Sequence, residues 1–193
     1  MRKNISSDSN KLLTGKLRDG MTIAAGGFGL CGIPENLIRT IAESGIKGLT
    51  IVGNNMGTDD KGMGLLLKNN QVSKVVASFV GDNKEFERQV LEGLLELELC
   101  PQGTLAEKLR AGGAGIPAFF TKTALGTVLA KNKPTQTFDG SEYVLEHSIK
   151  ADLSIIKSHI SDEAGNLRFR KTARNFNPMI ATCCLLYTSP SPR

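Results

Sequence analysis

The chain has 193 residues, of which 40% are hydrophobic and 21 are glycines, and this size and composition are typical of one α/β domain with a sizeable core. The net charge is +5, but the basic residues alternate with acids and tryptophan is absent, so we expect no nucleic-acid partner. The sequence has no run of about 18 apolar residues and no apolar N-terminal stretch typical of a secretory signal, so we expect a cytoplasmic protein with no membrane partner.

The first 111 residues predict strands that alternate with helices. Short apolar runs bounded by glycine or polar residues indicate buried strands, and apolar residues spaced three to four apart indicate helices. In chain order we predict a helix over 11–17, a strand over 21–25, a helix over 34–44 closed by Gly45, a strand over 49–52, a short helix over 64–69, a strand over 72–79, a helix over 84–93, a strand over 94–99 and a helix over 104–111. In the last helix, Thr104 and Glu107 have the spacing of a capping box. The alternation favours a largely parallel sheet covered on both faces.

The remainder of the chain has a weaker pattern. Residues 121–140 predict an excursion or hairpin, and late strands are expected over 142–145, 153–157 and 167–169, with a turn over 162–166. The composition changes abruptly at Cys183, where the sequence resembles translated sequencing-adapter read-through. We therefore expect one domain over residues 1–182, incomplete at its C-terminal end, and a non-native tail over residues 183–193.

A glycine-rich run follows the first predicted strand. Gly27-x-Gly29-x-x-Gly32 has the spacing of a dinucleotide-binding turn, but Pro34 begins the next helix only after the third glycine. Glu35 would lie in the first turn of that helix, where its charge would repel a pyrophosphate. No acid follows the second predicted strand at the spacing needed to bind a ribose. The run therefore predicts a loop that serves another ligand.

Four loops are expected at the carboxyl ends of strands, where ligands of open α/β sheets bind. They comprise residues 26–32, 53–57, 100–104 and 112–117, and they offer backbone N–H groups and neutral amides. Such donors suit a carboxylate, or an oxyanion that develops at a thioester carbonyl. The alternative for each loop is that its glycines only permit a tight turn.

A nucleophile with its base is missing from these loops. Cys31 lies between glycines with no evident His partner, so it is better interpreted as a small core residue. The four cysteines do not have the spacing of a disulfide framework, and neither His147 nor His159 has a Cys or carboxylate at ligand spacing, so we expect no metal site. If the protein is an enzyme, its reactive group is expected on another chain.

Several long motifs resemble family I coenzyme A transferases, and within that family the A subunits of the 3-oxoacid type. The resemblance spans residues 11–182 and rests on Asp19-Gly20, Gly26-Gly27-Phe28-Gly29-Leu30-Cys31-Gly32-Ile33-Pro34-Glu35, Asn54-Asn55, Gly81-Asp82-Asn83-Lys84, Pro101-Gln102-Gly103-Thr104, Gly112-Gly113-Ala114-Gly115-Ile116-Pro117 and Arg174-Asn175-Phe176-Asn177.

This resemblance implies a three-layer α/β/α fold with a largely parallel sheet, in a chain that pairs with a homologous B subunit. It implies that the nucleophilic glutamate is on the B subunit, that no catalytic residue is on this chain, and that CoA is carried as a glutamyl thioester in a ping-pong exchange. The implied donor is an acyl-CoA such as succinyl-CoA, and the implied acceptor is a 3-oxoacid such as acetoacetate, as in ketone body metabolism. Coenzyme A would then be part of a substrate, and no cofactor is expected. The implied substrate-binding residues are Gly26, Gly27, Phe28, Gly29, Asn54, Asn55, Gln102, Gly113, Ala114 and Gly115.

The residues themselves leave two other functions open. A sugar-phosphate isomerase of related fold would need an acid or lysine base in one of the four loops. A non-catalytic acyl-CoA-sensing domain would bind CoA esters without transferring them.

Overall fold

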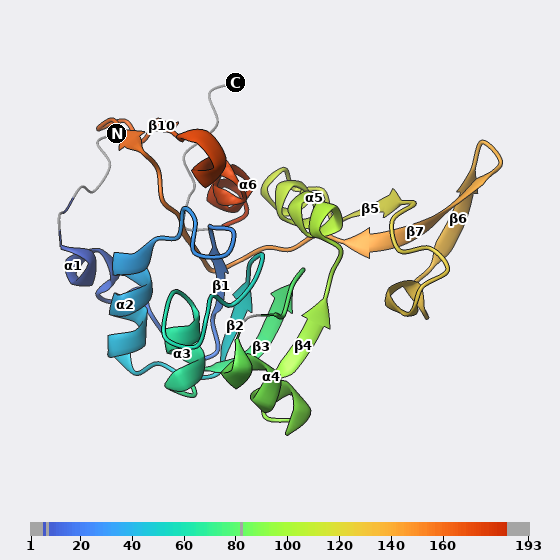
Figure 1. The fold of residues 1–193 in the computed structure, drawn as a ribbon. Helices are drawn as coiled ribbons and strands as arrows, with labels where there is room; N and C mark the ends of the chain where they lie inside the picture. Colours follow the sequence, from blue (N-terminus) through green and yellow to red (C-terminus); the bar gives the residue numbers. More distant parts are fainter. Residues whose placement is uncertain (1–5, 7, 82, 185–193) are drawn as a thin grey trace.

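The centre of the fold is a parallel β-sheet. The computed structural model describes residue 6 and residues 8–81 and 83–184. The five strands of the sheet lie in the order β4-β3-β2-β1-β8, and all neighbouring pairs are parallel. They are β1 (Thr22–Ala25), β2 (Leu49–Val52), β3 (Val72–Ala77), β4 (Glu96–Leu99) and β8 (Leu153–Ile155). The chain adds β2, β3 and β4 on one side of β1 and β8 on the other, so the strand order reverses between β1 and β8 (Figure 1).

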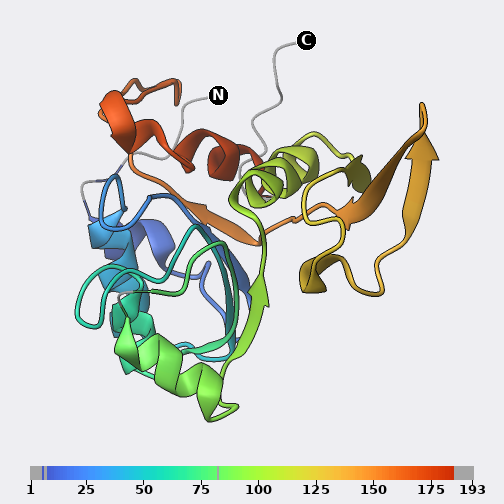
Figure 2. The same ribbon diagram turned by 45° about the vertical axis from the view of Figure 1, so that its right-hand side comes forward.

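Helices cover both faces of this sheet. They are α1 (Ser9–Leu13), α2 (Glu35–Ser44), α3 (Gly64–Lys68), α4 (Lys84–Leu91), α5 (Gln102–Gly113) and α6 (Asn177–Thr182). Figure 2 shows α2, α3 and α4 on one side of the sheet and α5 and α6 on the other. The predicted three-layer α/β/α fold is therefore confirmed.

Alternate side chains along the central strands belong to two hydrophobic cores, one on each face of the sheet. In β3, Val75 belongs to the core cluster that includes Phe86 of α4, whereas Val76 belongs to the cluster that includes Leu105 of α5. Ile23 and Ala24 of β1 are divided in the same way. Because successive side chains of a strand point to opposite faces, an apolar run buried on both sides is what a central parallel strand requires.

The predicted excursion is a small antiparallel sheet that projects from the body of the molecule (Figure 1). Its strands are β5 (Ala118–Thr121), β6 (Thr135–Phe138) and β7 (Ser141–His147), in the order β5-β7-β6, and the 3₁₀ helix η1 (Val128–Ala130) lies in the connection. Only β7 corresponds to a predicted strand. The sequence does not indicate the two flanking strands because the side chains of β6 are all exposed and those of β5 are all half-buried, so neither has an alternating pattern.

A short hairpin precedes the last helix. It consists of β9 (Ile160–Ser161) and β10 (Leu167–Arg168), and the 3₁₀ helix η2 (Lys171–Arg174) follows it. The predicted turn over residues 162–166 is confirmed, because the backbone N–H of Asn166 donates to Asp162 Oδ1 at 2.8 Å.

Several predicted helix boundaries differ from the structure, among them those of α1 and α2. The first helix ends at Leu13 rather than at residue 17, because Gly15 has a φ of 70° and lies outside the helical region. Pro34 is the residue before α2 rather than its first residue, and Gly45 closes this helix at φ 72° as expected.

The predicted capping box at Thr104 is wrong. The helix begins at Gln102, so Thr104 lies inside it, and its hydroxyl is buried with no hydrogen-bond partner among the residues that the structure describes. Glu107 instead pairs with Arg110 at 2.6 Å, and this hydrogen bond lowers the pKa of the Glu107 carboxyl.

Replacing Thr104 with valine is expected to leave the stability unchanged or to raise it by about 1 kcal/mol. Valine has nearly the same shape as threonine and removes a buried polar group that makes no hydrogen bond. The free energy of unfolding in urea tests this, with Thr104→Ser as the matched control that keeps the hydroxyl and loses the methyl group. A valine variant less stable than the serine variant would contradict the statement that the Thr104 hydroxyl is buried without a hydrogen-bond partner among the described residues.

A buried ion pair joins the projecting sheet to the body. Lys108 of α5 and Glu146 of β7 are 6% and 2% exposed, and Nζ lies 3.3 Å from Oε2. Lys133 reaches the other oxygen of Glu146 at 2.6 Å, and Glu98 of β4 lies 3.2 Å from Lys108. Burial opposes the charge on Lys108, but Cys100, Glu98 and Glu146 outweigh it and raise the pKa of Lys108. The group is therefore held as a cation among carboxylates.

The last described residues pack against the body. Cys183 and Cys184 are buried, the backbone N–H of Ala151 donates to the Cys183 carbonyl at 3.0 Å, and Ala151 and Cys184 form a parallel bridge. The rest of the predicted tail, residues 185–193, lies outside the described residues. Within the described ranges, no helix is both long enough and apolar enough to cross a bilayer.

Candidate functional site

Polar groups gather where β1, β2, β3 and β4 end. The glycine loop (residues 26–32) follows β1, Asn54 and Asn55 follow β2, Ser78 follows β3, and Gln102 lies three residues after the end of β4. The four strands are parallel neighbours, so their carboxyl ends meet at one edge (Figure 2). Ligands of open α/β sheets bind at this edge.

Asn54 is the centre of this group. Its side chain is 4% exposed, and Oδ1 accepts hydrogen bonds from Gln102 Nε2 at 2.7 Å and from Ser78 Oγ at 3.0 Å. Its backbone carbonyl accepts the N–H groups of Ser78 and Phe79, both at 3.1 Å. The predicted residues Asn54 and Gln102 are therefore in direct contact, although 48 positions separate them.

These contacts fix the orientation of the Asn54 amide. Both hydrogen bonds of the side chain are made by Oδ1, and Nδ2 donates to no residue that the structure describes. An amide held in this way presents an N–H donor without needing to reorganise, which is the property of a group that stabilises developing negative charge.

Gln102 adds the N-terminus of a long helix to the same site. It is the first residue of α5, which has 12 residues, and no side chain among the described residues caps this helix. The free N–H groups and the dipole of the first turn favour an anion. Gln102 itself is exposed. The edge therefore offers several donors to a carboxylate or an oxyanion.

The glycine loop is folded tightly beside Asn54. Gly27 has a φ of 126°, and a Cβ there would lie 2.5 Å from Ile33 Cγ2, so no other residue fits. Gly29 has a φ of 58° with open space around it. Phe28 and Cys31 exchange backbone hydrogen bonds at 3.0 and 2.9 Å, and Phe28 is 51% exposed.

A small cavity lies between the glycine loop and the loop after β2. Its volume is about 10 Å³, and it is lined by Ala25, Gly26, Gly27, Gly29, Ile33, Asn54, Asn55, Gly57 and Met63. This is room for about one water molecule. The structure thus brings together all predicted residues from the first two loops except Phe28, whose ring lies outside the cavity lining.

The fourth predicted loop is not at this edge. The sequence predicts that residues 112–117 follow a strand, but α5 continues through Gly113, Ala114 is its C-cap, and Gly115 follows at φ 76°. A Cβ on Gly113 would lie 2.5 Å from the Thr182 carbonyl, so this glycine permits α5 and α6 to pack closely. The structure places Gly113, Ala114 and Gly115 at the opposite end of α5 from Gln102.

At this edge the described residues offer hydrogen-bond donors, and none of them is a nucleophile with a base beside it. The glycine loop and residues 53–57 contain no carboxylate. The prediction that Cys31 is a small core residue is wrong, because Cys31 is exposed on the glycine loop, with its Sγ 3.6 Å from the hydroxyl of Thr172. Burial raises the pKa of the Cys100 thiol to about 11, so this cysteine is not ionised at neutral pH.

Comparison with known proteins agrees with this geometry. The family profile described as coenzyme A transferase matches residues 8–188. The chain is 58% identical over 175 residues to the A subunit of succinyl-CoA:3-ketoacid coenzyme A transferase from Xanthomonas campestris, and the match covers 91% of this chain and 72% of that protein. The chain belongs to the coenzyme A transferase family. It is also 56% identical over 177 residues to the A subunit of that name from Helicobacter pylori, over 92% of this chain and 76% of that protein.

Solved structures of coenzyme A transferases share the fold. An acyl-CoA transferase from Escherichia coli O157:H7 matches with a TM-score of 0.76 at 18% identity, over 88% of this chain and 38% of that chain. The glutaconate coenzyme A-transferase from Acidaminococcus fermentans matches with a TM-score of 0.76 at 18% identity, over 92% of this chain and 63% of that chain. The chain therefore spans less than two thirds of either solved chain.

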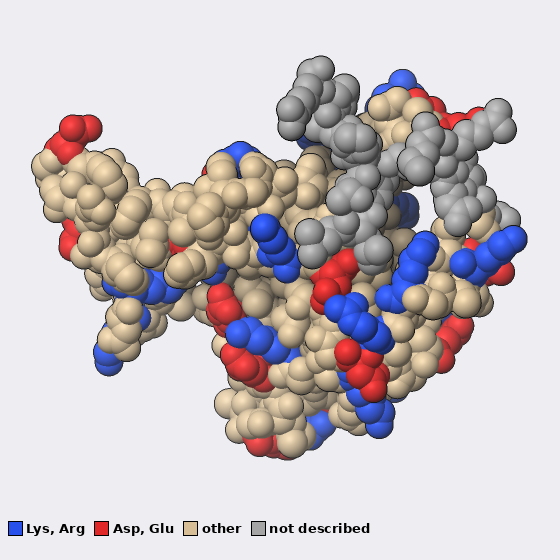
Figure 3. Space-filling model, turned by 180° about the vertical axis from the view of Figure 1, so that it is seen from behind, with Lys and Arg blue, Asp and Glu red and all other residues tan. Residues whose placement is uncertain are grey.

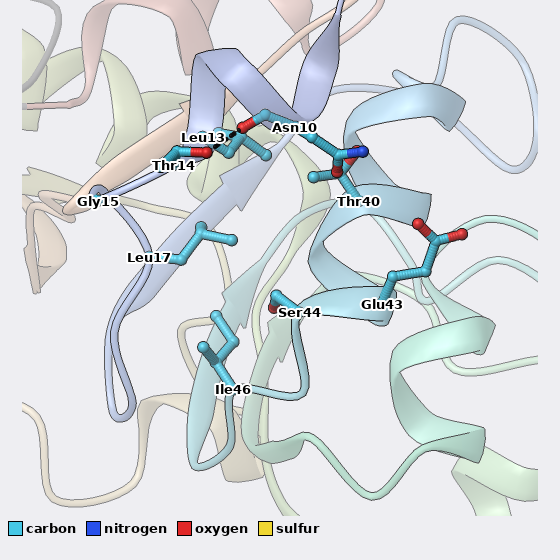
Figure 4. Close-up of a pocket in the computed structure, with 9 residues that line it drawn as sticks. All are labelled: Asn10, Leu13, Thr14, Gly15, Leu17, Thr40, Glu43, Ser44 and Ile46. Carbon is cyan, nitrogen blue, oxygen red and sulfur yellow. Dashed lines mark hydrogen bonds between the residues drawn. The ribbon is translucent and has the colours of Figure 1, made fainter.

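A larger cavity of this coenzyme A transferase chain lies away from the strand ends. Its volume is about 330 Å³, and Figure 4 shows Asn10 and Leu13 of α1 beside Thr40, Glu43 and Ser44 of α2. Its hydroxyls already have partners within the protein: Thr40 Oγ1 pairs with Ser9 at 2.8 Å, and Ser44 Oγ donates to the Ile41 carbonyl at 2.6 Å. The cavity is at the C-terminal end of α2, whereas the glycine loop leads into its N-terminal end. We therefore place the site at the strand ends.

Charge on the surface of this coenzyme A transferase chain is mixed. On the face drawn in Figure 3, Lys and Arg lie among Asp and Glu. Several charged residues of the chain are paired, such as Lys74 with Glu96 at 2.8 Å and Lys68 with Asp60 at 2.9 Å. The described residues in this view form no extended basic surface of the kind that attracts nucleic acid.

Proposed function

We propose that this chain is the A subunit of a cytoplasmic succinyl-CoA:3-ketoacid CoA-transferase, which moves CoA from succinyl-CoA to a 3-oxoacid such as acetoacetate. The observation that carries the proposal is the Asn54 amide, whose Oδ1 is held by Gln102 and Ser78 and whose Nδ2 donates to no described residue, in a site where no described nucleophile has a base beside it. The names of the relatives from Xanthomonas campestris and Helicobacter pylori support the substrates. Coenzyme A enters as part of a substrate, and acetoacetate would place the enzyme in ketone body metabolism.

In this mechanism the reactive carboxylate comes from the B subunit. A glutamate of that partner attacks the acyl-CoA, CoA becomes attached to it as a thioester with release of the acyl group as a carboxylate, and the 3-oxoacid carboxylate then takes the CoA. Negative charge develops on the thioester oxygen in each half of the exchange. The Asn54 N–H group and the uncapped first turn of α5 stabilise that charge, and the glycine loop lets the backbone approach the substrate closely.

The proposal predicts that activity requires both chains. The purified chain alone is expected to produce no acetoacetyl-CoA from succinyl-CoA and acetoacetate, and addition of the B subunit is expected to restore the transfer. The isolated B subunit is the control. Transfer by this chain alone, or a stable complex of the two chains that binds acyl-CoA and transfers nothing, would contradict the proposal. The second result would favour an acyl-CoA-sensing domain, whereas turnover of a pentose phosphate would favour an isomerase.

A further inference from the structure

Asn177 lies where the order of the strands reverses between β1 and β8. It is the first residue of α6 and is completely buried, at 0% exposure. Its Oδ1 accepts the backbone N–H of Lys157, just after β8, at 3.0 Å. Its Nδ2 donates to the carbonyls of Gly32 at 3.1 Å and Ala173 at 3.0 Å. One side chain therefore joins the loop after β8, the glycine loop and the 3₁₀ helix η2.

The Asn177 amide occupies the space that a side chain on Gly26 would need. A Cβ on Gly26 would lie 1.9 Å from Asn177 Oδ1 and 2.7 Å from its Cγ, so the Asn177 amide would have to leave its position and its hydrogen bonds. The backbone of Gly26 does not have the positive φ that favours glycine, so its conformation does not require this residue. Its N–H donates to the Ile155 carbonyl of β8 at 2.9 Å, so the strand pairing continues through it.

The other end of the glycine loop is held against the same segment. A Cβ on Gly32 would lie 2.8 Å from the Ala173 carbonyl. Asn175 Nδ2 donates to the Cys31 carbonyl at 3.0 Å, and its Oδ1 lies 3.3 Å from Asn177 Nδ2. The side-chain amides of Asn175 and Asn177 thus hold residues 31 and 32 against the segment that follows η2, by hydrogen bonds to backbone carbonyls.

We propose that Asn177 is a positioning residue, which fixes the glycine loop against η2 and β8, and that Gly26 lacks a side chain to admit the Asn177 amide rather than a ligand. The catalytic consequence rests on the proposed function, because the loop that Asn177 holds lines the site beside Asn54. A buried amide with all its bonds satisfied has one favourable orientation and transmits it to the groups that it contacts.

A double-mutant cycle in the isolated chain tests the steric claim. Gly26→Ala is expected to lower the melting temperature strongly in the wild-type background and much less in the Asn177→Ala background, because truncation removes the atoms that the new Cβ would meet. Gly103→Ala is the matched control: its Cβ would meet nothing within 4 Å, so its effect is expected to be the same in both backgrounds. An equal loss from Gly26→Ala in both backgrounds would overturn the steric claim.

Hydrogen exchange and kinetics test the positioning claim. In Asn177→Ala, or in Asn177→Ser if the first variant does not fold, the amides of residues 27–32 are expected to exchange faster while those of β2 keep their protection. In the complex with the B subunit, kcat is expected to fall roughly 10- to 100-fold, with a much smaller change in the KM for succinyl-CoA. Unchanged exchange of the loop, or equal acceleration in β2, would overturn the claim, as would full kcat in a variant with a loosened loop. An inactive wild-type complex would instead count against the proposed function, and the exchange and the double-mutant cycle would still test the inference.

Discussion

Asn54→Ala is expected to lower the kcat of the complex about 10²- to 10³-fold, the effect typical of removing one preorganised donor to an oxyanion. The amide is oriented before substrate binds, because Oδ1 is held by Gln102 at 2.7 Å and by Ser78 at 3.0 Å. The KM for succinyl-CoA is expected to change much less, since the donor acts on charge that develops during the reaction. Steady-state transfer from succinyl-CoA to acetoacetate measures both constants.

Two further variants separate the donor from the packing around it. Asn54→Asp keeps an acceptor for Gln102 and Ser78 and replaces the donor with an anionic oxygen, so it is expected to lose at least as much kcat as the alanine variant. Ser78→Ala removes one hydrogen bond that orients Asn54 and leaves its donor in place, so its loss is expected to be about 10-fold or less. A folded Asn54→Ala variant with the kcat of the wild type would contradict the role of this amide.

Glu146→Ala is expected to lower the free energy of unfolding by about 3–5 kcal/mol, because it leaves a buried ammonium group without its nearest buried partner. Glu146 and Lys108 are 2% and 6% exposed, and the carboxylate also accepts from Lys133 at 2.6 Å. Urea unfolding of the isolated chain measures the change.

The matched control for this prediction removes both buried charges. Lys108→Met combined with Glu146→Leu is expected to be close to neutral, because neither charge then remains buried alone. Lys133→Ala removes a cation that is 34% exposed and is expected to cost about 1 kcal/mol or less. If the free energy of unfolding of Glu146→Ala falls by less than about 1 kcal/mol, the prediction is contradicted, because Lys108 then finds another partner or water.

The main sheet could be predicted from the sequence because its signals are local. The strand over Leu49–Val52 and the helix that ends at Gly45 follow from short apolar runs and from a glycine at positive φ. The end of α5 could not be predicted, since Gly112 and Gly113 look like a loop in the sequence. A Cβ on Gly112 would lie 1.9 Å from the Ile149 carbonyl, a contact between segments that no local pattern reveals.

Only part of the site could be predicted, for the same reason. Asn54 and Gln102 each follow a strand, and parallel strands bring them to one edge, where they meet at 2.7 Å. Ser78 follows β3 in the structure, but the strand predicted over 72–79 contains it, so the same reasoning did not find it. Asn177 could not be found in this way, because it begins a helix that follows the glycine loop by 145 positions and reaches it through a side-chain amide. Its burial and its three carbonyl and N–H contacts become visible only in the folded chain.

In the proposed mechanism this chain stabilises charge while its partner supplies the nucleophile. The most direct test is mass spectrometry of the two-chain complex after incubation with succinyl-CoA, without acceptor and with borohydride- or hydroxylamine-treated controls to identify the thioester. We expect a CoA adduct on a glutamate of the B subunit, with an unmodified mass for this chain. A CoA adduct on a residue of this chain, with the B subunit unmodified, would contradict it.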